Sequence, residues 1–137
     1  MFSSRIKVII LSIKTDQPKA YLGLWRGQEL IDEISWPAHR ELSDTIHTQI
    51  TALLAKSNLK LSNIEGLLVF RGPGSFTGLR ISVTVFNSLA YGLGIPIVGS
   101  KGSDWQEKGI QHLLGGQDNN IVVPYYGAEA NISFPKK

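Results

Sequence analysis

The sequence predicts an α/β fold in which a mixed five-stranded sheet is flanked by helices. Two observations lead to this expectation. Strand-like segments lie close together in residues 6–36, and segments with helical periodicity then alternate with short apolar runs up to residue 100. The order of three strands, a helix, a strand, a helix and a strand fits an antiparallel meander followed by parallel strands with right-handed crossovers.

The first three segments are expected to be neighbouring strands. Residues 6–13 are nearly all apolar and β-branched, which predicts a central strand buried on both faces of the sheet. Residues 19–27 and 28–36 alternate between apolar and other side chains, as half-buried strands do. Because only short turns separate these segments, an antiparallel meander is the most economical arrangement.

The hydrophobic period changes after Pro37. The next apolar residues follow at spacings of 4, 4, 3 and 1, which predicts one face of a helix that ends near residues 57–58. These residues are Leu42, Ile46, Ile50, Leu53 and Leu54. Ser43 is expected to cap the start of this helix, and Asp44 then lies favourably near its positive end.

The remaining segments complete the pattern. Residues 63–70 are expected to form a strand, 79–94 a helix that ends at Gly92 or Gly94, and 95–100 a further strand. Ribonuclease-H-like domains and the lobes of actin-like (ASKHA) ATPases have this order of elements. Beyond them, at most one short helix is expected at 104–114, and residues 121–127 can add an edge strand.

Size and composition indicate one globular domain. The chain has 137 residues, of which 42% are hydrophobic and 18% are charged, a balance that suits a packed core rather than disorder. No apolar run approaches the roughly 20 residues that span a bilayer, so no contact with a membrane is expected. The apolar start is interpreted as a buried strand rather than a signal peptide, because Ser12 interrupts it and no small-residue cleavage site follows.

The chain lacks the residues that several kinds of chemistry need. The chain has no cysteine, which excludes disulfides, thiolate metal sites and a cysteine nucleophile, and fits a cytosolic protein. His39, His47 and His112 do not have the spacing of helical metal ligands, so no metal site is predicted. The formal net charge of +3 permits contact with an RNA backbone but does not argue for it.

A glycine-rich loop, RGPGSFTGLR at 71–80, joins the expected strand 63–70 to the helix that follows. Such a loop and a helix start can hold a phosphate, but the G-K-[ST] ending of a P-loop is absent. The residues alone favour a turn shaped by four residues: Gly72, Pro73, Gly74 and Gly78. Ser75 has no neighbouring base in the sequence, so it is expected to cap the helix rather than act as a nucleophile.

The whole string is more specific than its glycines. "RGPGSFTGLRI" followed by "SLAYGLGIPIVGS" resembles the signature of the TsaB (YeaZ) family, an inactive relative of the threonylcarbamoyl-transferase TsaD that is often grouped with glycoprotease-like peptidases. "HRELSDTIHTQITALLAKSNLKLSNIEGLLV" resembles the first helix and next strand of that family, and "PYYGAEAN" its closing segment. The resemblance implies that residues 1–100 form the family's first lobe and that 101–137 are a short remnant of the second lobe with a C-terminal tail.

The resemblance also implies a function. TsaB-like proteins are cytoplasmic scaffolds without a catalytic residue or cofactor of their own, and they activate TsaD in the modification of tRNA with threonylcarbamoyladenosine. A small ATPase, TsaE, joins that complex, tRNA is contacted indirectly, and a homodimer is left open. The chain is therefore expected to be a pseudo-enzyme that forms a heterodimer with a TsaD-like protein.

The turn after the first strand agrees with a non-catalytic role. The family usually has an Asp at the position of Lys14, and a cation cannot help bind Mg²⁺, which needs carboxylate oxygens. Asp16 lies two residues further on and is expected to face elsewhere. The alternative function is a small actin-like enzyme that binds and hydrolyses ATP. A peptidase lacks support because no nucleophile–base pair is evident.

The partner interface is expected on the glycine loop and the helix after it. That helix has one apolar stripe at Leu79, Val83, Phe86 and Ala90 and another at Ile81, Val85 and Leu89. Because one domain needs only one such stripe for its core, one of the two is expected to meet a second chain. The residues assigned to this interface are Arg71, Ser75, Phe76, Thr77, Arg80, Val83, Phe86, Asn87 and Ala90.

Overall fold

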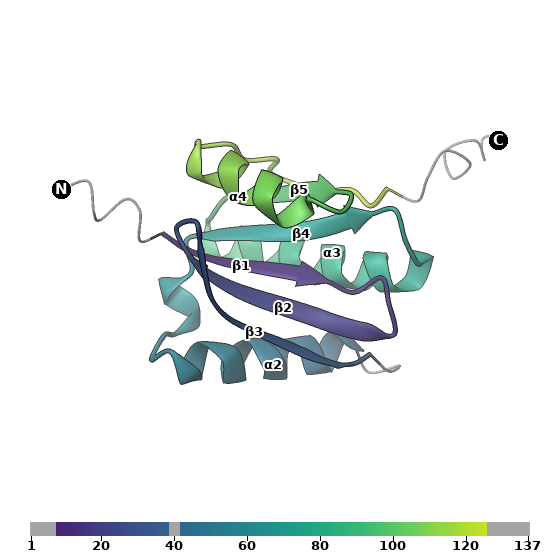
Figure 1. Cartoon of the computed structure of the whole chain (residues 1–137), viewed down its shortest axis with the longest axis horizontal. Helices are drawn as coiled ribbons and strands as arrows, with labels where there is room; N and C mark the ends of the chain where they lie inside the picture. Colours follow the sequence, from purple (N-terminus) through teal and green to yellow (C-terminus); the bar gives the residue numbers. More distant parts are fainter. Residues whose placement is uncertain (1–7, 39–41, 126–137) are drawn as a thin grey trace.

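The computed structural model describes residues 8–38 and 42–125, apart from the side chain of Phe76, and contains the expected mixed sheet (Figure 1). The strands lie in the order β3-β2-β1-β4-β5. β1 pairs antiparallel with β2 and parallel with β4, while β2–β3 is antiparallel and β4–β5 parallel. Their bounds are β1 Ile9–Lys14, β2 Lys19–Arg26, β3 Glu29–Pro37, β4 Gly66–Gly72 and β5 Ile97–Lys101.

The helices cover both faces of this sheet. Helices α2 (Leu42–Lys56) and α3 (Phe76–Leu93) pack on one face, and α4 (Trp105–Leu114) packs on the other, over β4 and β5 (Figure 1). A 3-10 turn, η1 (Leu61–Asn63), lies between α2 and β4. Because α4 packs on the same sheet as α2 and α3, the chain beyond residue 100 contributes directly to this layered unit. No described helix is long and apolar enough to cross a membrane.

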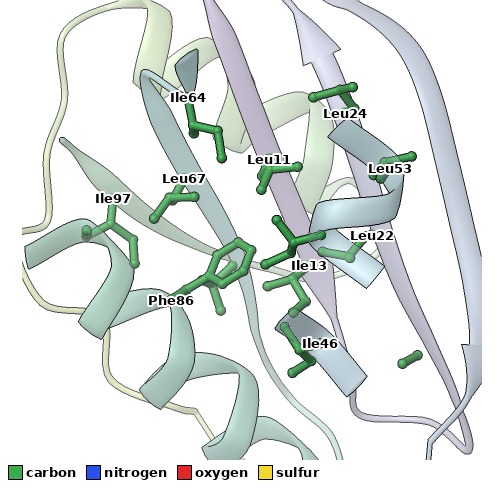
Figure 2. Close-up of a cluster of buried hydrophobic side chains, with 14 of the residues drawn as sticks. Leu11, Ile13, Leu22, Leu24, Ile46, Leu53, Ile64, Leu67, Phe86 and Ile97 are labelled. Atoms are coloured by element: carbon green, nitrogen blue, oxygen red, sulfur yellow. The ribbon is translucent and has the colours of Figure 1, made fainter. Parts of the chain in front are cut away.

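The larger hydrophobic cluster lies between the sheet and the pair α2 and α3. Figure 2 shows Phe86 of α3 pointing toward Leu11 and Ile13 of β1, with Ile46 of α2 beside them. All four side chains are fully buried. Burial of each such side chain contributes about 1.5–3 kcal/mol relative to exposure, so this face supplies the main stabilisation of the domain.

The opposite face of β1 is buried too, as the sequence predicts. Ile10 belongs to a second cluster with Phe70 of β4 and with Trp105 and Ile110 of α4. The rings of Phe70 and Trp105 meet edge to face, with centroids 5.6 Å apart. β1 is therefore the central strand of the sheet, enclosed on both sides.

The element boundaries differ from the prediction mainly around the glycine loop. α3 begins at Phe76 rather than residue 79, so Gly78 lies inside its first turn. The helix ends as expected at Gly94, which has the left-handed conformation with φ 68°. Ser75 occupies the N-cap position, but its hydroxyl makes no capping hydrogen bond, so the predicted side-chain cap is wrong.

Two further predictions are corrected. Ser43 does not precede α2 but is its second residue, so it cannot be the N-cap. Residues 121–125 do not form a strand; Asn87 instead holds Val122 by two hydrogen bonds of 2.9 Å, one to its N–H and one to its carbonyl. Since these groups pair with a side chain rather than with β5, the ladder of the sheet does not extend here. Residues 126 and 127 lie outside the described part.

Candidate functional site

The glycine loop packs tightly against the turn that follows β1. Gly72 has a φ of 130°, which disfavours other residues, and precedes a cis peptide bond to Pro73. A Cβ atom at Gly74 would collide with the side chain of Asp16, and one at Gly78 would collide with the carbonyl oxygen of Thr15. The absence of side chains at these glycines therefore allows the loop and the turn to touch.

Lys14 and Asp16 form an ion pair at this contact. The Lys14 ammonium also lies 4.5 Å from the centroid of the Phe70 ring. The Asp16 side chain is only 4% exposed and accepts a second hydrogen bond, 3.2 Å long, from Nε2 of Gln17. The expectation that Asp16 faces elsewhere is wrong, because its side chain pairs with Lys14 and lies against Gly74. The Thr15 hydroxyl holds this turn to α3 by donating to the carbonyl of Gly78 at 2.7 Å.

This arrangement places a cation and its own counterion at the end of β1. Mg²⁺ requires several free oxygen ligands, whereas the Asp16 carboxylate is already bound by Lys14. Within residues 8–38 and 42–125, no group of three or more acidic or histidine side chains could hold a metal ion. His47 of α2 and His112 of α4 are exposed on separate helices, and His39 lies outside the described residues.

The two apolar stripes of α3 have different surroundings. Leu79, Val83, Phe86 and Ala90 are at most 4% exposed and pack in the domain's own core. The assignment of Val83, Phe86 and Ala90 to a partner interface is therefore wrong, because their side chains are already covered. The second stripe, with Ile81, is only partly buried at the edge of the core, so it is the stripe that can reach another chain.

The other residues assigned to the interface fall into two groups. Ser75, Thr77 and Arg80 are exposed at the start of α3. Arg71 and Asn87 instead hold the segment that follows α4, since Nε of Arg71 donates to the carbonyl of Val123 at 2.9 Å and the Asn87 amide binds Val122. Phe76 lies in the first turn of α3, and its side chain is outside the described part.

A groove of about 350 Å³ lies beside the exposed start of α3, next to the beginning of α2. It is lined by Ser43, Thr77, Arg80, Ile81, Thr84 and Val85. Ile81 and Val85 give it an apolar floor, and the hydroxyl groups and Arg80 provide a polar rim. Chemically, the groove suits a side chain of a packed partner better than a reaction, because none of its lining residues is a general base. We call this surface the α2–α3 groove.

The assigned interface did not include Ser43, Ile81, Thr84 or Val85. The second apolar stripe contained the signal for Ile81 and Val85, but the spacing alone did not show which stripe faces the sheet. Ser43 and Thr84 carried no signal, because their position in the groove depends on how α2 packs beside α3.

Comparisons with known proteins point to one group. The family model of TsaD, tRNA N6-adenosine threonylcarbamoyltransferase, matches residues 36–101. The tRNA threonylcarbamoyladenosine biosynthesis protein TsaB of Escherichia coli is 30% identical over 129 residues, which are 85% of this chain and 53% of that protein. The TsaB protein of Haemophilus influenzae is 36% identical over 76 residues, covering 55% and 31% of the two chains.

A transferase and a solved structure are also similar. The tRNA N6-adenosine threonylcarbamoyltransferase of Geotalea daltonii is 44% identical over 62 residues, which are 45% of this chain and 18% of that protein. YeaZ from Pseudomonas aeruginosa has the same fold, with a TM-score of 0.62 and 23% identity over 69% of this chain and 44% of its own. The chain spans about half the length, or less, of the curated relatives it matches.

Proposed function

The chain belongs to the TsaB (YeaZ) family, and we propose that it takes part in tRNA threonylcarbamoyladenosine biosynthesis as a non-catalytic subunit. In this role it activates a TsaD-like transferase in the cytoplasm and uses no cofactor of its own. The observation that carries the proposal is the ion pair of Lys14 with Asp16.

That ion pair opposes the chemistry of an actin-like ATPase. An Mg²⁺ ion at the end of β1 would need a free carboxylate and would instead meet the Lys14 ammonium group, which already holds Asp16. The ammonium group of Lys14 is neutralised by Asp16 and lies over the Phe70 ring. A metal ion that took Asp16 as a ligand would leave this ammonium group without its counterion. The lobe therefore keeps the fold of the transferase without this part of its catalytic apparatus.

The partner surface of this proposal is the α2–α3 groove with the exposed start of α3. Its half-buried apolar side chains gain further burial when a helix packs over them, and Thr84, an exposed lining residue, is small enough to let that helix approach. Thr77, Arg80 and Ser75 then contribute polar contacts at the rim. A TsaE-like ATPase and tRNA join through the TsaD-like partner, and two copies of the chain can use the same groove in its absence.

Co-elution tests the heterodimer. The chain and the TsaD-like protein of its own organism are mixed at micromolar concentrations and separated by size-exclusion chromatography, and a shared earlier peak is expected. Replacing Thr84 by Arg places a long charged side chain in the groove and is expected to weaken binding at least about tenfold, since burying an unpaired charge costs more than 1.4 kcal/mol. The exposed substitution His112→Arg on α4 is the matched control.

Two results would reject the proposal. Separate elution of the native chains, with tRNA and ATP present, would contradict the heterodimer. Equal binding by the Thr84→Arg and His112→Arg variants would contradict the groove as its interface. Calorimetry with ATP and Mg²⁺ addresses the alternative enzyme. Tight, metal-dependent binding of ATP would show that Lys14 does not exclude the nucleotide.

A further inference from the structure

A second cavity, of about 340 Å³, lies on the face of the sheet opposite the α2–α3 groove. It is lined by Trp25, Gln28, Glu107, Ile110 and Gln111. Trp25 comes from the end of β2, Gln28 from the turn before β3, and the other three from α4, which covers this face (Figure 1). No part of the proposed function uses this cavity, which we call the Trp25 cavity.

The indole ring of Trp25 is held in place by a chain of hydrogen bonds through β1 to α4. Its Nε1–H donates to Oγ of Ser12 at 3.1 Å, and the Ser12 hydroxyl donates to Oε1 of Gln106 at 2.6 Å. Gly23 makes room for this contact, because a Cβ atom there would lie 2.6 Å from Oγ of Ser12 and 3.2 Å from Nε1 of Trp25. The polar edge of the indole is therefore already bonded within the domain, and the residue lines the cavity with its aromatic ring.

The polar groups that line the cavity can accept hydrogen bonds, and one of them carries a negative charge. Glu107 is the charged residue among its lining residues, and Gln28 and Gln111 provide amide oxygens. The neighbouring cation on α4, Lys108, is engaged by Asp104 at 3.5 Å and does not line the cavity. An aromatic ring, a carboxylate and two amide groups around an apolar floor form a site for a cation.

We propose that the Trp25 cavity binds an arginine side chain presented by a protein partner. A guanidinium group is planar, stacks on aromatic rings and is weakly hydrated, and its five donors match the oxygens of Glu107, Gln28 and Gln111. A lysine ammonium is more strongly hydrated and cannot stack as a plane. Because the cavity and the α2–α3 groove lie on opposite faces, both can be occupied at once, and either proposal can fail without the other.

Nuclear magnetic resonance provides a direct test on the whole chain. Nα-acetyl-arginine methylamide is titrated into ¹⁵N-labelled protein, and the indole N–H signal of Trp25 is expected to shift in a saturable way at millimolar ligand. Trp36 is an internal control, because its indole donates to Thr45 on the other side of the sheet. The matching citrulline compound has the same shape without the charge and is expected to leave the Trp25 signal in place.

Two variants distinguish binding in the Trp25 cavity from a general effect of surface charge. Glu107→Gln is expected to weaken arginine binding about fivefold or more, because a charge-assisted hydrogen bond is replaced by a neutral one. Asp44→Asn removes an exposed carboxylate of α2, on the other face of the sheet, and is expected to leave binding unchanged. The proposal is overturned if Trp25 does not respond, if citrulline or the matching lysine compound binds equally well, or if the two variants behave alike.

Discussion

The two faces of the sheet are buried by different chemistry. Under α2 and α3, β1 presents Ile9, Leu11 and Ile13 to the core, and the last two meet Phe86 in a mainly apolar cluster (Figure 2). Under α4, the same strand presents Ile10 and the hydroxyl of Ser12, which is bonded within the domain. The first face thus gains stability mainly by excluding water, whereas under the second face the central strand itself takes part in satisfied hydrogen bonds.

The largest effect is expected from Phe86→Ala on the apolar face. Phe86 is fully buried, and its loss leaves a cavity that the surrounding β-strands cannot fill, so the free energy of unfolding should fall by about 3–5 kcal/mol. Urea denaturation followed by circular dichroism measures the change. Phe86→Leu is the control and should cost clearly less, while equal losses would mean that the packing of this face does not depend on volume.

This contrast shows what the sequence can predict. The apolar run of β1 correctly indicated burial on both faces, and the spacing of Leu42 and Ile46 correctly indicated the inward side of α2. These predictions succeed because the periods of strands and helices follow from local backbone geometry. The ring of Trp25 and the hydroxyl of Ser12 meet across two strands, and no local pattern encodes that contact.

The candidate site was predicted only in part, for the same reason. The position of Lys14 could be predicted from the sequence, because it lies at the end of an evident strand. Its effect on a metal site depends only on its positive charge. The place of Asp16 could not, because it depends on how closely Gly74 and Gly78 let two distant loops approach. Likewise, spacing found both stripes of α3, but only the packing of the helix against the sheet decides that Phe86 is inside.

A smaller loss is expected from Ser12→Ala on the polar face. The substitution removes the acceptor of the Trp25 indole N–H and the donor to Gln106, but it leaves the backbone and most of the packing in place. An unsatisfied, partly buried N–H costs about 1–3 kcal/mol, so the loss should lie below that of Phe86→Ala. Urea denaturation measures it under the same conditions.

The Ser12→Ala variant also sharpens the comparison by spectroscopy. Because the indole of Trp25 loses its acceptor, its N–H should exchange with solvent faster than in the native protein. The indole of Trp36, which donates to Thr45 under the other face, should be unaffected. If the unfolding free energy and both exchange rates stay unchanged, the hydrogen bonds of this face contribute nothing measurable, and the contrast between the faces disappears.

The smallest effect concerns Tyr21, whose hydroxyl donates to Oε1 of Glu33 at 2.8 Å on the α4 side of the sheet. Burial, and then this bond, raise the pKa of Tyr21 from 10.0 to about 12. The native state therefore keeps the phenol proton at pH values where the unfolded chain has lost it. The resulting stabilisation is fully present below pH 10 and is lost as the pH rises toward 12.

Solvent screening at this half-buried group should limit the pH-dependent loss to about 1 kcal/mol. Urea denaturation of the native protein and of Tyr21→Phe at several values between pH 9 and pH 11.5 isolates it, because the other tyrosines are common to both chains. The stability advantage of the native protein should shrink with rising pH. A constant difference would mean that Tyr21 titrates alike in both states, and the polar face would then owe its stability to the bonds of Ser12 rather than to a protected phenol.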